Sequence, residues 1–364
     1  MTGVQTCALP ISKVPKEPKV PKEPKVPKVP KQPKEPKEPK EPKEPKVQHE
    51  YNKGFEINQK IIDNLKILVE YETIHKETFK VRAYEKVIDA IELYDRPIQT
   101  IEDIKNIKGV GKKIEDKISE FLSTGKMHAV ENAQQDTKYI FGKQLLSIYG
   151  IGPAKIDELI GKVSSIEELK TKPELLNDKQ RIGLKYYDDL QLRIPIAEGK
   201  KHYTLINKTL KKIHKDIEFE MVGSFRRKNK DMGDIDILIK NTSNINLENI
   251  ISGLHESGYI EETLASGKNK FMGICRLSPD LPARRIDILL ADPSYYYFAL
   301  LYFTGSYQFN IYMRRIALQK GVSLSEYGFK NNNTKQMINT EDIIHSEEDI
   351  FKYLDIPYVT PNKR

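Results

Sequence analysis

The stretch GSFRRKNKDMGDIDILI, residues 223–239, decides the fold of the second half of the chain. At its end aspartates alternate with isoleucines, and successive side chains of a β-strand point to opposite faces. Asp234 and Asp236 are therefore expected to project from one face of a strand, while the isoleucines beside them point into a core. A second strand is predicted for RIDILL, residues 285–290, where Asp287 can join the same face. Strands mixed with helices predict an α+β domain here.

Three carboxylates on one face favour a site for divalent metal ions. Neighbouring carboxylates repel one another unless a cation lies between them. Such a set suits a pair of Mg²⁺ ions, which substrate phosphates and water would complete. Two metals lower the pKa of an attacking hydroxyl and stabilise a leaving pyrophosphate. The alternative is an Asp-x-Asp pair in an edge strand with ordinary solvated carboxylates, and the Gly-Ser and two arginines upstream argue against it.

The same stretch also suggests how a triphosphate is held. Gly223-Ser224 has the composition of a turn that leads into a helix, and the N-terminus of a helix attracts phosphate. Arg227 adds a side chain that is always charged.

Two earlier segments share the helix-hairpin-helix pattern of apolar residue, Gly, apolar residue, Gly and helix start. They are IKGVGKKIEDKI, residues 107–118, and IYGIGPAKI, residues 148–156. Their glycines are expected to allow a tight turn with positive φ, after which a helix N-terminus offers free N–H groups to a DNA phosphate. A single segment of this kind is equally compatible with an ordinary tight turn. Two in register favour DNA binding that does not depend on base sequence.

The N-terminal part differs in composition from the rest of the chain. Residues 13–47 repeat the triplet Lys-X-Pro and contain 12 Lys and 6 Glu, so they carry +6 of the formal net charge of +8. Proline at every third position excludes helix and sheet and favours an extended polyproline conformation. This tail is interpreted as a solvated spacer, with a cationic arm on nucleic acid or a nuclear-import patch as the alternative. Residues 1–11 resemble the translation of a sequencing-library adapter.

Length and composition exclude several classes of protein. The 364 residues suggest more than one domain. No apolar stretch approaches the roughly 20 residues of a membrane-spanning helix. Cys7 and Cys275 are the two cysteines, which excludes a disulfide framework and favours an intracellular, reducing location, the nucleus for a cellular protein or a replication compartment or virion for a viral one.

The order of these motifs resembles family X DNA polymerases, and the beta branch most closely, from about residue 55 to the end. GVGKKIEDKISEFLSTGK, QRIGLKYY, KFMGIC and LYFTGS carry the resemblance together with the stretch quoted first. It implies a multidomain α and α+β fold, in which a helical lyase domain precedes a polymerase domain with a nucleotidyltransferase palm. The expected divisions are a tail over 12–48, the lyase domain over 49–133, a helical DNA-binding subdomain over 134–195, the palm over 196–291 and a nucleotide-selection subdomain over 292–364.

The resemblance assigns roles to individual residues. Asp234, Asp236 and Asp287 would bind the metals, and Asp287 would activate the primer 3′ hydroxyl. The nucleotide would contact Arg193, Ser224, Arg227, Gly233, Tyr302, Phe303, Gly305 and Asn310. The DNA would contact Lys80, Tyr84, Gly109, Gly111, Lys113, Gly150, Gly152, Arg285 and Arg314. Na⁺ or K⁺ would bind backbone carbonyls around Lys105, Ile107, Val110, Leu146, Ile148 and Ile151.

Lys117 occupies the position of the family's Schiff-base lysine, which removes a 5′ deoxyribose phosphate by β-elimination. Lys113 lies one helical turn earlier, and a neighbouring cation lowers the pKa of an amine. The alternative is that Lys117 only binds phosphate.

Three positions depart from the beta pattern. Leu289 replaces a basic residue, as in the lambda branch, which argues against a salt-bridge switch at Asp236. Tyr307 replaces an acidic residue near the nucleotide base. Ala129 stands where a phosphate-binding lysine is expected.

The predicted function is that of a DNA-directed DNA polymerase that fills short gaps in base excision repair by nucleotidyl transfer with two Mg²⁺ ions, or Mn²⁺, and has 5′-deoxyribose-phosphate lyase activity. Its expected partners are gapped or nicked duplex DNA with a 5′ phosphate, deoxynucleoside triphosphates and repair proteins, and it is expected to act as a monomer away from membranes. Two alternatives stay open. One is a template-independent terminal transferase, against which Tyr302-Phe303 argues, and the other is a catalytically silent protein that binds gapped DNA.

Overall fold

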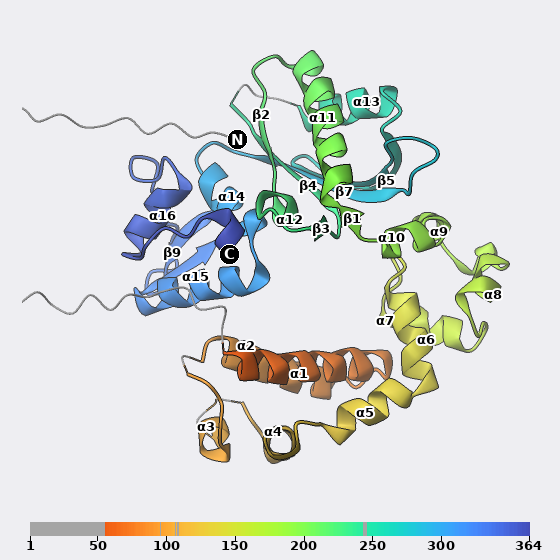
Figure 1. Cartoon of the computed structure of the whole chain (residues 1–364), viewed down its shortest axis with the longest axis vertical. Coiled ribbons are helices and arrows are strands. Elements are labelled where there is room, and N and C mark those ends of the chain that lie inside the picture. The colour runs from red at the N-terminus through yellow and green to blue at the C-terminus, as the bar shows by residue number, and fades with distance from the viewer. Residues whose placement is uncertain (1–54, 95, 106, 108, 243–245) are drawn as a thin grey trace, which may run out of the picture. The chain divides into compact units, whose positions relative to one another are not determined.

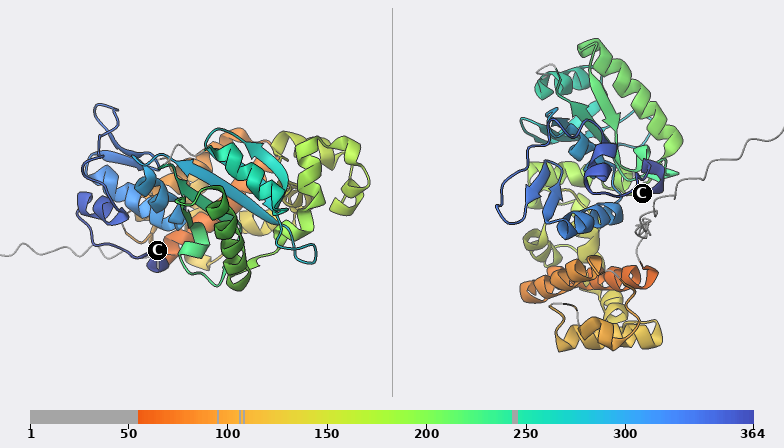
Figure 2. Two further views of the ribbon diagram at one scale, coloured as in Figure 1. Left: turned by 90° about the horizontal axis from the view of Figure 1, so that it is seen from above. Right: turned by 90° about the vertical axis from the view of Figure 1, so that its left-hand side faces the viewer.

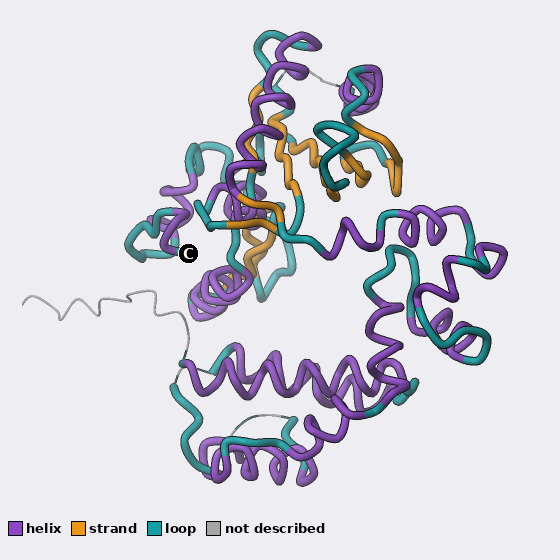
Figure 3. The backbone as a smooth tube through the Cα atoms, turned by 45° about the vertical axis from the view of Figure 1, so that its right-hand side comes forward, coloured by secondary structure: helices purple, strands orange, loops and turns teal. Residues whose placement is uncertain are grey.

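The computed structural model describes residues 55–364, apart from 95, 106, 108 and 243–245. The adapter-like segment, the Lys-X-Pro tail and the first residues of the predicted lyase domain lie outside the described residues. Helices come first and a mixed α+β region follows, as the sequence predicts, and all the strands of the described part come after residue 193 (Figure 1, Figure 3). No helix in this part is both long and apolar enough to cross a membrane.

The first helical region has its own hydrophobic core. It consists of α1 (Glu56–Ile74), α2 (Thr78–Glu92), α3 (Ile101–Lys105), α4 (Lys112–Thr124) and α5 (His128–Gln135). Apolar residues at helical spacing supply this core, with Ile61, Leu65 and Val87 fully buried.

The second helical region continues the chain with a separate core. It consists of α6 (Thr137–Leu146), α7 (Pro153–Ile160), α8 (Ile166–Lys170), the 3₁₀ turn η1 (Pro173–Leu175), α9 (Asp178–Lys185) and α10 (Tyr187–Gln191). Leu145, Ile156 and Leu159 are fully buried in its centre. A Cβ added at Gly142 of α6 would lie 2.8 Å from a methyl carbon of Ile74, so this glycine allows α1 and α6 to pack closely.

The palm is built on a five-stranded sheet with strand order β2-β4-β7-β6-β5. Its elements are β1 (Ile194–Pro195), α11 (Ile196–Ile213), β2 (Glu218–Met221), α12 (Gly223–Arg226), β3 (Asp231–Met232), β4 (Ile235–Lys240), α13 (Leu247–Glu256), β5 (Ile260–Ser266), β6 (Lys270–Cys275) and β7 (Arg284–Ala291). β4 and β7 run parallel, and the other neighbours run antiparallel. The helices α11 and α13 contact each other and pack against one face of the sheet (Figure 2).

The C-terminal region packs on the same sheet through α14. It contains α14 (Tyr296–Thr304), α15 (Tyr307–Gln319), the hairpin β8 (Val322–Ser325) and β9 (Gly328–Asn331), α16 (Glu347–Tyr353) and the 3₁₀ turn η2 (Pro361–Lys363). Ala299 and Leu300 of α14 share a core with Leu238 of β4. Because Leu238 and Asp236 are two residues apart on one strand, α14 covers the face of the sheet that carries the aspartate.

Candidate active site

The sheet register brings two of the predicted carboxylates side by side. In the parallel ladder of β4 and β7, Asp236 is the direct partner of Asp287. The flanking isoleucines, Ile235, Ile237, Ile286 and Ile288, are at most 2% exposed, so they hold both strands in the core. The alternation read from the sequence thus places both aspartates on the opposite face from the helices.

Asp234 lies just before β4 and is turned toward Arg285, with which it forms an ion pair. Arg285 Nε also lies 3.8 Å from Asp287 Oδ1. No three His, Cys, Asp or Glu side chains among the described residues are gathered as a metal-binding group. The charges of Asp234 and Asp287 nevertheless act on Asp236, so the three aspartates lie close enough to interact electrostatically.

Burial and mutual repulsion act on the protonation of these carboxyl groups. Burial, followed by the charges of Asp234 and Asp287, raises the pKa of Asp236 to about 7. Burial also raises the pKa of Asp287, although the charges of Arg285 and Lys270 oppose the shift. Asp287 Oδ1 is buried without a hydrogen-bond partner in the described part of the chain. Carboxylate oxygens are the ligands that a divalent cation such as Mg²⁺ prefers. A cation bound here would neutralise the repulsion between the carboxylates and would give Asp287 Oδ1 a partner.

The predicted triphosphate turn packs directly against this pair. Gly223 has φ +57°, and a Cβ there would lie 2.5 Å from Asp236 Oδ2, so only glycine permits this approach. The helix that follows is α12, which is only four residues long. A helix thus follows the turn, and the expectation that its N-terminus holds a triphosphate stays a prediction. Polar side chains beside it are Ser224 and Arg227, whose Nη2 donates to Ser224 Oγ at 3.2 Å.

The turn is joined to the end of α14, where other predicted nucleotide contacts lie. Arg227 Nη1 donates to the carbonyl of Thr304, and Gly305 follows with φ +63°. Asn310 Nδ2 donates to the carbonyl of Tyr302 at 2.8 Å. Tyr302, Asn310 and Arg314 also line one small hollow. The structure thus brings residues from the palm and the C-terminal region to one place.

A buried ion network that the sequence did not predict supports this junction. Arg226 donates to Thr304 Oγ1 at 2.7 Å and to Glu347 Oε2 at 2.6 Å, and Arg364 donates to Glu347 Oε1 at 2.7 Å. Glu347 is 5% exposed. The arginine pair after Gly223-Ser224 was the available signal, but its partner is 121 residues away.

The predicted lyase residues lie on α2 and α4, which share a core through Tyr84, Ile114 and Ile118. Lys117 is partly exposed, and its Nζ donates to the carbonyl of Lys113 at 3.3 Å. Lys80 Nζ donates to Glu72 at 3.1 Å, so a phosphate at this lysine would compete with a carboxylate.

The two helix-hairpin-helix turns have nearly the same backbone geometry. Gly109 and Gly150 have φ of +98° and +82°. The second glycine of each pair was also expected to have positive φ, but Gly111 and Gly152 are extended and act as N-caps of α4 and α7. Nothing lies within 4 Å of a Cβ built on these caps, so a strand of DNA can approach the backbone.

The residues predicted for monovalent ions lie at these turns or directly beside them. Two of their carbonyls accept turn hydrogen bonds, that of Ile107 from Val110 N and that of Ile148 from Ile151 N.

The three departures from the beta pattern occupy different surroundings. Leu289 lines a cavity of about 30 Å³ with Asp236 and Asp287, and an aliphatic side chain cannot pair with either carboxylate. Tyr307 donates to Glu92 of α2 at 2.8 Å, which links its hydroxyl to the first helical region. Ala129 is packed against the core of that region.

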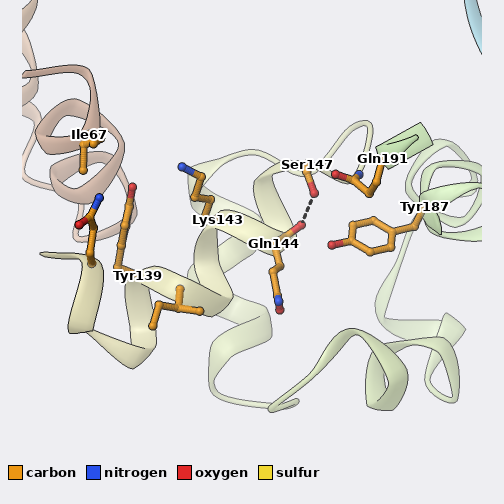
Figure 4. A pocket seen from close by; sticks show the side chains of 9 residues that line it. Ile67, Tyr139, Lys143, Gln144, Ser147, Tyr187 and Gln191 are labelled. Carbon is orange, nitrogen blue, oxygen red and sulfur yellow. Dashed lines mark hydrogen bonds between the residues drawn. The ribbon is translucent and has the colours of Figure 1, made fainter. Parts of the chain in front are cut away.

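A larger hollow, of about 420 Å³, lies away from the aspartates along α6 and α10 (Figure 4). Tyr139, Gln144 and Tyr187 are among the side chains that line it. Its one cationic side chain, Lys143, is paired with Glu70 at 3.0 Å. None of the predicted site residues lines this hollow.

A palm sheet with adjacent aspartates, joined to a Gly-Ser turn with two arginines, defines a nucleotidyltransferase. The comparison with protein families agrees, since models of the DNA polymerase beta palm and thumb match residues 193–293 and 299–364. A helix-hairpin-helix domain model matches 56–127, and a model of the fingers domain of DNA polymerase lambda matches 143–191. Models of DNA polymerase beta and lambda domains thus match successive parts of the chain, which is related to the family X DNA polymerases.

Individual relatives are similar at moderate identity. DNA polymerase lambda of Rattus norvegicus is 27% identical over 334 residues, which cover 87% of this chain and 58% of the relative. DNA polymerase lambda of Arabidopsis thaliana is 27% identical over 307 residues, covering 78% and 57%. DNA nucleotidylexotransferase of Xenopus laevis is 26% identical over 351 residues, covering 85% and 68%. The chain thus spans less than two thirds of the length of the two lambda relatives.

Proposed function

We propose that this protein is a DNA-directed DNA polymerase that fills short gaps in duplex DNA with a 5′ phosphate, as in base excision repair. The observation that carries the proposal is the direct pairing of Asp236 with Asp287 in the parallel ladder, beside a glycine turn that accepts no larger residue. Two Mg²⁺ ions bound there would supply positive charge to the attacking and leaving oxygens.

The protein's own groups would then act on the primer and the nucleotide. Asp287, whose pKa is raised by burial, accepts the proton of the primer 3′ hydroxyl as its oxygen bonds to the α-phosphorus. The bond from that phosphorus to the pyrophosphate oxygen breaks at the same centre. Ser224 and Arg227 hold the phosphates that leave, because their side chains come from the turn beside Asp236.

The test is extension of a 5′-phosphorylated duplex with a one-nucleotide gap, in Mg²⁺, by the full chain. We expect Asp287→Asn to lower incorporation by about a thousandfold or more, because the variant loses both the metal ligand and the proton acceptor. Asp292→Asn is the matched control. Asp292 follows β7 directly, and its side chain accepts hydrogen bonds from the backbone and the hydroxyl of Ser294. Equal incorporation by the wild type and Asp287→Asn would contradict the proposal.

The similarity to a nucleotidylexotransferase supports a second candidate, a template-independent transferase. Both candidates would use the same aspartates, so the substrates must distinguish them. Extension of a single strand or blunt end as fast as the gap would favour the second candidate. Incorporation limited to the nucleotide complementary to the template would exclude it.

We also infer a 5′-deoxyribose-phosphate lyase activity at Lys117. The partly exposed amine stands on α4, immediately after the first helix-hairpin-helix turn, where a 5′ phosphate would be held. In this proposal the Lys117 amine is the nucleophile that forms the Schiff base with the deoxyribose.

A further inference from the structure

A carboxylate that the predicted site does not include, Asp231, holds one of its arginines. Arg193 Nε and Nη2 both donate to Asp231 Oδ1, at 3.0 and 2.7 Å. The backbone brings them together, since β1 and β3 form a two-stranded ladder in which Ile194 pairs with Met232. Both of these side chains are buried, at 0% and 1% exposure. Asp231 pairs with Pro195 in the same ladder, so Arg193 and Asp231 lie on opposite sides of the Ile194–Met232 pair. Both alternate with that buried pair and project from the other face, where they meet diagonally across the ladder.

The ion pair also fixes which edge of the guanidinium faces the site. Asp231 occupies Nε and Nη2 through a single oxygen, and Nη1 lies 2.9 Å from the position of a Cβ at Gly233. Gly233 directly precedes Asp234. Because Gly233 has no side chain, the charged Nη1 group of Arg193 can lie over the backbone directly before Asp234.

Solvent exposure indicates that this pair contributes little to folding. The side chain of Arg193 is 59% exposed and that of Asp231 is 31% exposed. Ion pairs with this degree of exposure add little to stability, because water screens them and both side chains lose rotamer freedom. Asp231 nevertheless holds the long side chain of Arg193 at two donor atoms. The conformation of Arg193 is therefore set before a ligand binds.

We propose that Asp231 is a positioning residue for the incoming nucleotide, which holds Arg193 over Gly233 so that its Nη1 edge meets the triphosphate. This inference rests on the proposed function and on the contact between Arg193 and the nucleotide that the family resemblance implies. The opposing effect is competition, because a carboxylate beside an arginine also repels phosphate. We expect the positioning of Arg193 to affect nucleotide affinity more than this repulsion does. Asp231 binds the edge of the guanidinium that faces away from the triphosphate, and water and salt screen the repulsion between the carboxylate and the phosphates.

Nucleotide binding is the measurement that tests Asp231 apart from catalysis. The affinity of the full chain for the complementary deoxynucleoside triphosphate is measured on a gapped duplex whose primer ends in a dideoxynucleotide, so no chemistry occurs. We expect Asp231→Ala to raise Kd about fivefold and Asp231→Asn, which keeps an oxygen acceptor, to raise it less. On an ordinary primer, KM should rise in parallel while kcat changes less than about twofold.

A double-mutant cycle distinguishes positioning from a general structural role. In an Arg193→Ala background, Asp231→Ala should raise Kd no further, because the residue it positions is gone. Glu218→Ala is the matched control, since it removes an exposed partner of Lys240 in the five-stranded sheet, outside the ladder of β1 and β3. It should leave Kd unchanged.

Three results would overturn the inference: an unchanged Kd in Asp231→Ala, a lower Kd, which would mean competition, or the same rise with Arg193 absent. Failure of the proposed function has a different readout, namely no templated incorporation by the wild type on the ordinary primer.

Discussion

The two proposed catalytic centres are built in opposite ways. In the palm, Asp236 and Asp287 come from different strands and meet through the register of a parallel ladder, where burial raises their pKa values. In the first helical region, Lys117 stands partly exposed on α4 and donates a hydrogen bond to a carbonyl of its own helix. The palm centre depends on long-range pairing and tight packing, whereas the lyase centre depends on local helix geometry. Changes should therefore damage the two activities separately.

The largest difference between the effects on the two activities is expected from Lys117→Ala. Because Schiff-base formation needs the amine, borohydride trapping of an abasic-site adduct should fall by at least about a hundredfold. Gap filling should remain within about twofold, since Lys117 lies on α4, outside the palm and C-terminal regions. Trapping is measured on a 5′-incised abasic duplex, with Lys126→Ala, an exposed lysine just after the same helix, as the control. An adduct that persists in Lys117→Ala would place the nucleophile elsewhere.

Gly223→Ala is expected to have the converse effect, which is loss of polymerase activity with lyase activity retained. The added methyl would lie 2.5 Å from Asp236 Oδ2 on a backbone with φ +57°, so the turn or the aspartate must move. We expect incorporation to fall about a hundredfold or more, because displacements near 1 Å are costly at a reacting centre, while lyase trapping stays unchanged. Gly161→Ala is the control, since nothing lies within 4 Å of its Cβ position and its φ is ordinary for a helix end. Full polymerase activity in Gly223→Ala would show that the packing of the turn does not matter.

A smaller effect tests the electrostatic part of the comparison. A carboxyl group whose folded pKa of about 7 exceeds its unfolded value favours the folded state at low pH, and this contribution is lost as the pH rises from about 4 to 7. In metal-free protein, Asp236→Asn should therefore raise the unfolding temperature at pH 8, by about 5 °C, and by less as the pH falls toward 4. Thermal unfolding at both values, with and without Mg²⁺, measures this. Added Mg²⁺ should stabilise the wild type more than the variant, and an Asn variant less stable than the wild type at pH 8 would contradict the assignment.

The smallest effect is expected from deletion of residues 1–47. The tail holds +6 of the net charge of +8, so its removal should weaken DNA affinity mainly at low salt. Gap filling and lyase trapping should both change less than about twofold at saturating DNA, because both centres lie in residues 48–364. Affinity measured at two salt concentrations checks this, and loss of incorporation on deletion would disprove the division of roles.

Much of the fold could be predicted because its signals are local. The alternation around Asp234 and Asp236 predicted a strand, its buried isoleucine face and the opposite face from which Asp236 projects, since the side-chain period of a strand is two. The paired glycines predicted both helix starts, α4 and α7, from the geometry that only glycine adopts easily.

The features that the sequence left open depend on distant partners. Neither strand sequence specifies that Asp236 lies opposite Asp287, because register is set when the sheet forms. The ion pair of Asp234 with Arg285 and the junction of Arg226 with Glu347 join residues 51 and 121 positions apart. Local periodicity contains no information about such pairs. The conformations of Gly111 and Gly152 were missed for another reason, since a glycine is equally at home in an extended cap and in a left-handed turn.

The parallel ladder of β4 and β7 also sets the order in which the activities can appear during folding. A parallel pair needs a crossover, and here α13, β5 and β6 all lie between the two strands. The polymerase centre can exist only after this long loop has closed, a slow step for a chain, whereas α4 and its hairpin turn form from neighbours in sequence. On refolding from denaturant, lyase activity should return before polymerase activity, and the delay would time the closure of the palm sheet.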